Sequence, residues 1–211
     1  RKIEGDSVVS EIYEEYLLRD GAAEKTLLVK KRDESVLVFG HDGRTGFGLT
    51  DGRIRDDEGA AGEAYYRAHG EYYLRSLPFK WMDPGVRVEY AGRETAEGRE
   101  LDLLRVTAEE NVGKAWKDVW VAAIDRETHL LWEARLTHHR ENETWVSPPQ
   151  TGTTEITYRY TDYREVSGLR IPKRLEYYAE GRKSGENVIR TIEIDSGLAA
   201  AIFSPETHRE R

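Results

Sequence analysis

The chain has 211 residues, a net charge of -8 and no cysteine, so it can bury a sizeable core without covalent cross-links, while disulfide scaffolds and thiolate metal sites are excluded. Aromatic residues make up 10% of the chain and charged residues 34%, a balance that favours a folded domain with a charged exterior over disorder. The 32 basic residues are scattered among 40 acidic ones, which argues against nucleic acid or an anionic membrane surface as a partner.

Short strand-like runs separated by turn signals dominate the sequence. Turns such as Asp42-Gly43 and Asp51-Gly52 recur at short intervals, which is typical of an antiparallel meander. No helices alternate with these runs, so a doubly wound nucleotide-binding fold is excluded. In chain order, about ten strands are predicted, at 8–18, 26–31, 36–41, 86–91, 101–107, 116–124, 130–138, 154–162, 171–178 and 188–194.

One principal helix is predicted, at 60–77. Ala64, Ala68 and Tyr72 recur at helical spacing, and Pro78 ends the run. The apolar connector that follows the helix needs cover from water. We therefore expect the helix and the connector to lie across one end of the sheet.

Alternation within the strands predicts which side chains share a face. In the run 130–138 every second residue is apolar until the last, His138, so Trp132 and Ala134 are expected on one face. The preceding run puts Trp116 and Trp120 on one face, and a turn between the two runs would place Trp120 opposite Ala134. Large residues then meet small ones, as in a curved interior.

Three charged residues fall in rows that are otherwise apolar. Arg105 is predicted opposite Asp118, and Arg190 lies in the apolar row of the last predicted strand. A charge in such a place must be paired or reach water. These residues either hold the head group of a ligand or latch a lid, or they occupy ordinary positions at a rim or a bulge.

The last third of the chain has a distinctive pattern. The segment TEITYRYTDYREVSGLRIP (154–172) contains a strand ending in Asp-Tyr, a turn with Gly-Leu and a strand that opens with Ile-Pro. The segment IEIDSGL (192–198) and a tail with Phe203 and Pro205 follow. This pattern resembles the LolA-like proteins, the superfamily of outer-membrane lipoprotein-sorting carriers, and is closest to uncharacterised secreted bacterial members.

The resemblance implies a fold, a ligand class and a location. The implied fold is mainly β, an open (incomplete) antiparallel β-barrel with the helix across its mouth, in a single LolA-like domain over 1–211. The implied ligand is a lipid or the acyl chain of a lipoprotein, held in a hydrophobic cavity. The implied location is the periplasm or another exported compartment.

The candidate ligand site is the apolar interior. Aromatic and aliphatic walls are typical of pockets for apolar ligands, although the same side chains can simply fill a barrel core. The candidate cavity residues, with the interior charges included, are Tyr65, Tyr72, Phe79, Trp81, Arg105, Trp116, Asp118, Trp120, Trp132, Tyr158 and Arg190.

No catalytic residue, metal site or cofactor is predicted. His138 and His139 are adjacent, and neighbours in a strand point to opposite faces, which disfavours a shared metal ion. The sequence lacks a Gly-x-Ser-x-Gly motif, and no stretch approaches the ~20 apolar residues of a membrane span.

We therefore predict a protein of the cell envelope that is not an enzyme and that binds or transports a lipid or an acylated protein. Its protein partner is not identified by the sequence. Two alternatives remain: an envelope interaction or structural module with a filled core and no ligand, and a hydrolase that uses a carboxylate pair or a histidine at the mouth.

Overall fold

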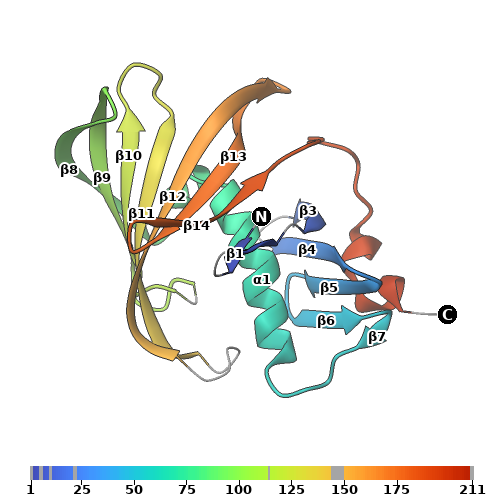
Figure 1. The fold of residues 1–211 in the computed structure, drawn as a ribbon. Helices are drawn as coiled ribbons and strands as arrows, with labels where there is room; N and C mark the ends of the chain where they lie inside the picture. The colour runs from blue at the N-terminus through green and yellow to red at the C-terminus, as the bar shows by residue number, and fades with distance from the viewer. Residues whose placement is uncertain are drawn as a thin grey trace. The chain divides into compact units, whose positions relative to one another are not determined.

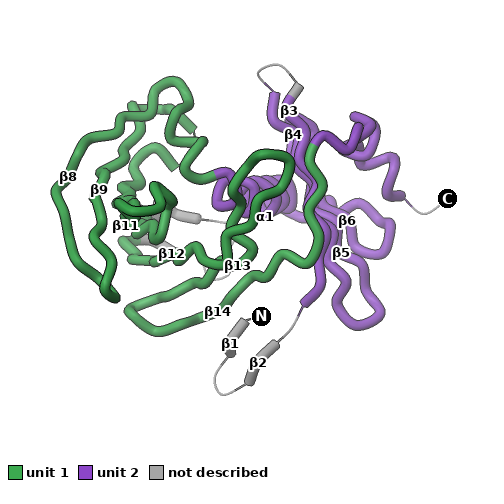
Figure 2. Tube along the Cα trace, turned by 90° about the horizontal axis from the view of Figure 1, so that it is seen from above, with its two compact units in different colours: residues 1–9, 77–143, 150–194 green, residues 10–76, 144–149, 195–211 purple. Residues whose placement is uncertain are grey.

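Figure 1 shows the computed structural model, which describes residues 2–4, 7–9, 11–20, 23–113, 115–143 and 150–209. These residues form two antiparallel sheets, one α-helix and three short 3-10 helices. The chain divides into two compact units (Figure 2). Unit 1 holds residues 1–9, 77–143 and 150–194, and unit 2 holds residues 10–76, 144–149 and 195–211. The mainly β class and the single principal helix are confirmed.

Unit 1 is built on a nine-stranded antiparallel sheet with the order β2-β1-β14-β13-β12-β11-β10-β9-β8. Its sequential strands from β8 to β14 are neighbours, so the meander predicted from the turns is confirmed. Among the described residues, β2 and β8 are the two edge strands of an open sheet, each paired on one side only. The strands are β1 (Lys2–Glu4), β2 (Ser7–Val9), β8 (Val86–Ala96), β9 (Arg99–Ala108), β10 (Val119–Asp125), β11 (Leu131–Glu143), β12 (Gln150–Val166), β13 (Leu169–Ala179) and β14 (Arg182–Val188). The 3-10 helix η1 (Phe79–Met82) precedes β8.

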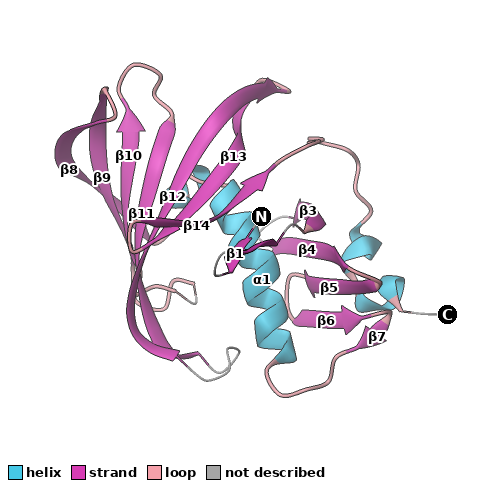
Figure 3. Ribbon diagram, in the orientation of Figure 1, coloured by secondary structure: helices cyan, strands magenta, loops and turns pink. Residues whose placement is uncertain are grey.

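Unit 2 is a five-stranded sheet with the order β3-β4-β5-β6-β7 and the helix α1 packed on it (Figure 3). Its elements are β3 (Ile12–Asp20), β4 (Ala23–Arg32), β5 (Ser35–His41), β6 (Gly46–Thr50), β7 (Arg53–Ile54), α1 (Ala60–Arg75), η2 (Ala200–Phe203) and η3 (Pro205–His208). Consecutive residues of a strand point to opposite sides, so the apolar residues of this sheet form two faces. A different segment covers each face.

Helix α1 covers one of these faces through small residues. It buries Ala60, Ala64 and Ala68, whose four-residue spacing puts them on one side of a helix. Ala64 and Ala68 pack against Leu28 and Phe39 of the sheet. The predicted helix 60–77 is therefore confirmed, with its end at Arg75 rather than at residue 77.

The other face of the five-stranded sheet is covered by the C-terminal tail. Leu27, Val38 and Leu49 form a buried cluster with Phe203, which lies in η2. The first strands of unit 2 and residues near the end of the chain therefore share one core. The two-sheet arrangement was not expected from the sequence, and the single domain over 1–211 stays a prediction, as does the position of the helix across a barrel mouth.

Two predicted strands are wrong. The run 8–18 is divided between β2 and β3, which belong to different sheets. The run 188–194 is not a strand either. Residues 189–194 lie outside strands, and the last strand of the sheet is instead β14. Its sequence, Arg-Lys-Ser-Gly-Glu-Asn-Val, has no apolar alternation, so it carries no strand pattern of its own. The ladder with β13 makes it a strand, through pairs such as Glu176 with Glu186.

The predicted registers are also corrected. Trp120 lies opposite Leu136 instead of Ala134, a shift of two residues that leaves both side chains on the predicted face. Arg105 lies opposite Val121 instead of Asp118. That second shift is by an odd number of residues, and such a slip turns every side chain of a strand to the other face.

Candidate ligand-binding site

Four aromatic rings meet on one face of the nine-stranded sheet. Trp120 of β10 and Tyr158 of β12 have ring centroids 5.7 Å apart, and Tyr158 and Tyr177 of β13 are 5.5 Å apart. Trp81 reaches the same face from η1, with its ring centroid 6.2 Å from that of Trp120. We call these four residues the aromatic row. They make a continuous track of rings across the sheet from β10 to β13.

Buried aliphatic and small residues surround the aromatic row. Ala122 and Ala134 are opposite each other on β10 and β11, and both are fully buried. Such small residues at the centre of the sheet leave room for the rings of neighbouring strands. Leu136 and Leu175 are buried on the same face, so this face is apolar throughout its middle.

The local turn explains why Trp81 joins the row and Phe79 does not. In a 3-10 helix, residues three apart lie on the same side, and both Phe79 and Met82 point into solvent, 62% and 84% exposed. Trp81 lies on the other side of the turn and is buried. The prediction that Phe79 faces the interior is therefore wrong.

Trp132 lies on the opposite face of the sheet from the aromatic row. It packs with Leu101 and Ala123, and the guanidinium of Arg159 stacks 4.7 Å from its ring centroid. Arg159 follows Tyr158 in β12 and therefore points to the other side. The register shift between Ala123 and Ile124 accounts for the error, because an extra residue in β11 interrupts the alternation.

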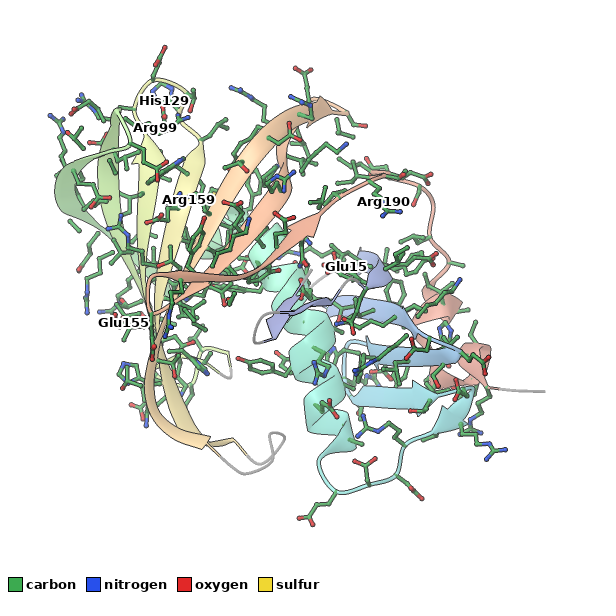
Figure 4. The ribbon with its side chains drawn as sticks, in the orientation of Figure 1. Glu15, Arg99, His129, Glu155, Arg159 and Arg190 are labelled. Carbon is green, nitrogen blue, oxygen red and sulfur yellow. The ribbon has the colours of Figure 1, made fainter. Side chains whose placement is uncertain are left out.

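This second face carries a chain of ion pairs. Arg135 is held between Glu94 and Glu133, with Nε donating to Glu133 at 2.7 Å. Arg159, which Figure 4 labels on β12, donates to the other oxygen of Glu133 at 3.1 Å. The hydrogen bonds to Glu94 and Glu133 raise the pKa of Arg135. The sheet thus has one apolar face and one charged face.

Asp118 is buried and paired, as a charge in an apolar row must be. Its carboxylate lies 2.9 Å from Nδ1 of His138 and accepts a hydrogen bond from the backbone N–H of His139 at 2.9 Å. Arg105, the partner expected from the sequence, is half exposed and lies 3.9 Å from Glu89. His138 was therefore not expected as the partner of Asp118, although the alternation places it at the end of an apolar row.

A surface pocket of about 440 Å³ opens beside Asp118, at the start of β10. The Lys117 ammonium lies 5.0 Å from the ring centroid of Trp116 there. The lining residues are Thr107, Ala108, Trp116, Lys117, Asp118, Val119 and His139. The structure therefore brings the candidates Trp116 and Asp118 together at a pocket that no member of the aromatic row lines.

The remaining candidates lie elsewhere. Arg190 is exposed on the segment that follows β14 (Figure 4), so its expected place in an apolar row is wrong. Tyr65 and Tyr72 belong to α1 in unit 2: Tyr65 stacks on His69 with ring centroids 4.8 Å apart, and the Tyr72 hydroxyl donates to Glu24 at 2.8 Å. A role for these two tyrosines in a ligand site stays a prediction.

Tyr177 is the member of the aromatic row that the candidates omitted. Its alternation with Leu175 in β13 was the available signal, and its hydroxyl accepts a hydrogen bond from the Asn187 side chain. Within the described parts of the chain, no three His, Asp or Glu side chains are grouped as metal ligands would be. In the same parts, no helix is both long enough and apolar enough to span a bilayer.

These features define an open antiparallel sheet with one aromatic face, and two solved structures share this fold. A DUF1329 family protein from Desulfovibrio piger superposes with a TM-score of 0.59 at 13% identity, over 97% of this chain and 86% of that one. A putative outer membrane lipoprotein-sorting protein domain from Vibrio parahaemolyticus superposes with a TM-score of 0.53 at 9% identity, over 95% and 84%. No family model and no curated protein matches the sequence.

The chain therefore has a LolA-like fold, as its C-terminal pattern predicted. At these identities the likeness concerns the fold alone.

Proposed function

We propose that unit 1 binds the acyl chain of a lipid or lipoprotein along the aromatic row, without catalysis, as a carrier or binding protein of the cell envelope. The observation that carries the proposal is the unbroken contact from Trp81 through Trp120 and Tyr158 to Tyr177 on a single apolar face. The sorting function in the name of the Vibrio structure supports the same ligand class. A carrier of this kind is periplasmic or otherwise exported.

The geometry of the row suits a linear apolar chain. From β10 to β13 the row crosses three strand spacings, or roughly 14 Å at 4.8 Å per strand. A chain lying along it gains about 0.8 kcal/mol for each methylene it buries. Leu136 and Leu175 would complete the walls, and the charged second face would keep the sheet in water.

The test is a binding titration with an environment-sensitive fatty-acid probe. Wild-type protein is expected to bind the probe saturably and to show quenched Trp fluorescence. Trp81→Ala is expected to weaken probe binding by about tenfold, equivalent to 1.4 kcal/mol of lost contact. Trp132→Ala is the matched control, because it removes the same ring from the other face of the same sheet and should leave the probe affinity unchanged.

The low solvent exposure of the aromatic row favours an alternative function, in which the rings fill a core and bind no ligand. Trp120 and Tyr158 are each only 8% exposed, as expected of an interaction module with a filled core. In that case Trp81→Ala costs roughly 3 to 5 kcal/mol of stability, and native protein shows no saturable binding. Probe binding that appears only on partial unfolding would reject the carrier function. Native mass spectrometry and organic extraction of the purified protein would show directly whether a lipid is carried.

A further inference from the structure

Within the described ranges of the chain, strand β8 ends the nine-stranded sheet and pairs on one side only, with β9. The Gly85 carbonyl accepts a hydrogen bond from the Glu109 N–H at 2.8 Å, and the register continues through Val86 with Ala108. Bonded and non-bonded pairs alternate along an antiparallel ladder. The backbone N–H and C=O groups of Val86, Val88 and Tyr90 therefore point away from β9, toward the free edge.

The side chains of this edge segment divide by type. Val88 and Tyr90 are 45% and 62% exposed, and Val88 lies opposite Val106, which itself lies opposite Trp120. The apolar residues of the edge therefore share the face of the aromatic row. Arg87 and Glu89 alternate with them on the charged face, where their side chains are 67% and 68% exposed.

We infer that a second copy of this chain pairs with β8 in antiparallel fashion, with Val88 of each copy on the two-fold axis. Two-fold pairing of a strand with itself sets each residue against its mirror position about the axis. Arg87 then lies opposite the partner's Glu89, and Glu89 opposite the partner's Arg87. On the other face Val86 lies opposite the partner's Tyr90, and the two Val88 side chains meet.

The backbone and the charges together select this register. The outward backbone groups belong to every second residue of β8. In the centre of this segment, the outward groups of the two copies meet only if the two-fold axis passes through a residue, which is Arg87, Val88 or Glu89, and not between two residues. An axis at Arg87 would oppose two arginines and one at Glu89 would oppose two glutamates, and like charges directly opposite are destabilising. The axis at Val88 alone gives two pairs of opposite charge.

The hydrogen bonds of this pairing follow from the same geometry. The two Val88 residues exchange N–H···O bonds, and each Tyr90 N–H reaches the partner's Val86 carbonyl. The Val86 N–H is already used, because it donates to the Asp83 carbonyl at 3.2 Å. At the other end, a register shift between Tyr90 and Gly92 breaks the edge, so the paired segment is short and the dimer is expected to be weak.

Arg87 and Glu89 are free to exchange partners. Arg87 lies 3.0 Å from Glu109, and Glu89 lies 3.9 Å from Arg105, in exposed pairs within the chain. Exposed pairs of this kind contribute little to stability. Re-pairing across the edge therefore costs each copy little.

The test is sedimentation equilibrium of the full chain at concentrations up to about 1 mM, since short interfaces bind weakly. Wild-type protein is expected to show a monomer–dimer equilibrium. Arg87→Glu alone and Glu89→Arg alone should each raise the dimer Kd by about tenfold, because each change turns both cross-strand pairs repulsive. The double variant Arg87→Glu/Glu89→Arg restores opposite charges and should recover most of the affinity.

Two further variants complete the design. Val88→Pro removes an outward N–H at an edge, where proline is tolerated, and should abolish the dimer. Arg182→Glu makes the same change of net charge at a distant, 86% exposed position and should leave the Kd unchanged. Far-ultraviolet circular dichroism checks that each variant is folded. A wild type that stays monomeric, a dimer that the single variants do not weaken, or a double variant no better than the singles would overturn the proposal.

Discussion

Glu15 is a half-buried carboxylate in surroundings that disfavour its negative charge. It lies on β3 beside Arg75 at the end of α1, with Nε of Arg75 3.4 Å from Oε2. Its Oε1 is buried and has no hydrogen-bond partner among the described residues. Burial raises the pKa of Glu15 to about 7, and Glu71 acts in the same direction while Arg75 lowers it. Glu15 is therefore more readily protonated at this site than a glutamate in water.

This raised pKa sets the sign of a pH dependence. Between the ordinary pKa of about 4.5 and the folded pKa of about 7, the folded state binds more protons than the unfolded state, so the free energy of unfolding falls as the pH rises. Glu15→Gln should remove up to about 3 kcal/mol of this fall. Urea unfolding of wild type and variant at pH 5 and pH 8 measures it.

The control for this measurement is Glu14→Gln, at the exposed neighbour of Glu15 on the same strand. It should keep the fall in stability seen in the wild type. Equal slopes against pH for the wild type and Glu15→Gln would show that Glu15 titrates as an ordinary surface acid.

Asp118 and His138 form a buried polar contact. Asp118→Ala would leave Nδ1 of His138 and the N–H of His139 without the acceptor they share, and we expect it to cost about 3 kcal/mol of stability. Asp102→Ala removes a carboxylate from an exposed pair with Arg93 and should cost less than about 1 kcal/mol. Thermal or urea unfolding of both variants compares them, and similar losses would contradict the assigned burial of Asp118.

At the scale of elements, α1 approaches β6 as closely as backbone allows. A Cβ added at Gly46 would overlap the Ala61 carbonyl oxygen and lie 3.1 Å from the Tyr65 nitrogen, whereas one added at Gly62 on the helix meets nothing within 4 Å. Gly46→Ala should therefore cost about 3 kcal/mol by pushing the helix off the sheet. Gly62→Ala should instead add about 0.5 to 1 kcal/mol, because alanine is the better helix former.

Denaturant unfolding of the two glycine variants measures this difference in sign. Since both replace glycine with alanine, a loss at Gly46 and a gain at Gly62 isolate the helix contact from the residue type. Destabilisation of the same size at both positions would mean that the helix does not rest on Gly46.

Elements with their own pattern could be predicted from the sequence, and those made by their neighbours could not. The alternation of Leu175 and Tyr177 and the alanines of α1 are local signals, and the strands and helix that they predict are present. β14 has no such signal and depends on its ladder to β13. The face of Trp132 could not be predicted for a related reason. A single extra residue in a strand moves the side chains beyond it to the opposite face of the sheet, and no sequence pattern marks that residue.

At the scale of the whole molecule, each unit is assembled from segments far apart in the chain. The core of unit 2 joins Leu27, Val38 and Leu49 to Phe203. In the sequence, the strands β8 to β14 of unit 1 lie between Leu49 and Phe203. No shift in composition marks these boundaries, so the two units could not be predicted from the sequence. The aromatic row is likewise drawn from η1 and three separate strands.

Phe203 should therefore matter far more than its place near the end of the chain suggests. It is 1% exposed, and Phe203→Ala should cost roughly 3 to 5 kcal/mol of stability. Phe79→Ala removes the same ring from a site that is 62% exposed and should change the stability by less than about 0.5 kcal/mol. Urea unfolding followed by circular dichroism gives both values, and a Phe203 variant as stable as the Phe79 variant would contradict the shared core.

The late position of Phe203 bears on the order of events during synthesis. Strands β3 to β6 leave the ribosome well before η2, which covers one face of their sheet. A sheet with an uncovered apolar face is poorly stable and prone to aggregate. We therefore expect unit 2 to reach its native state only after residue 203 has been released from the ribosome.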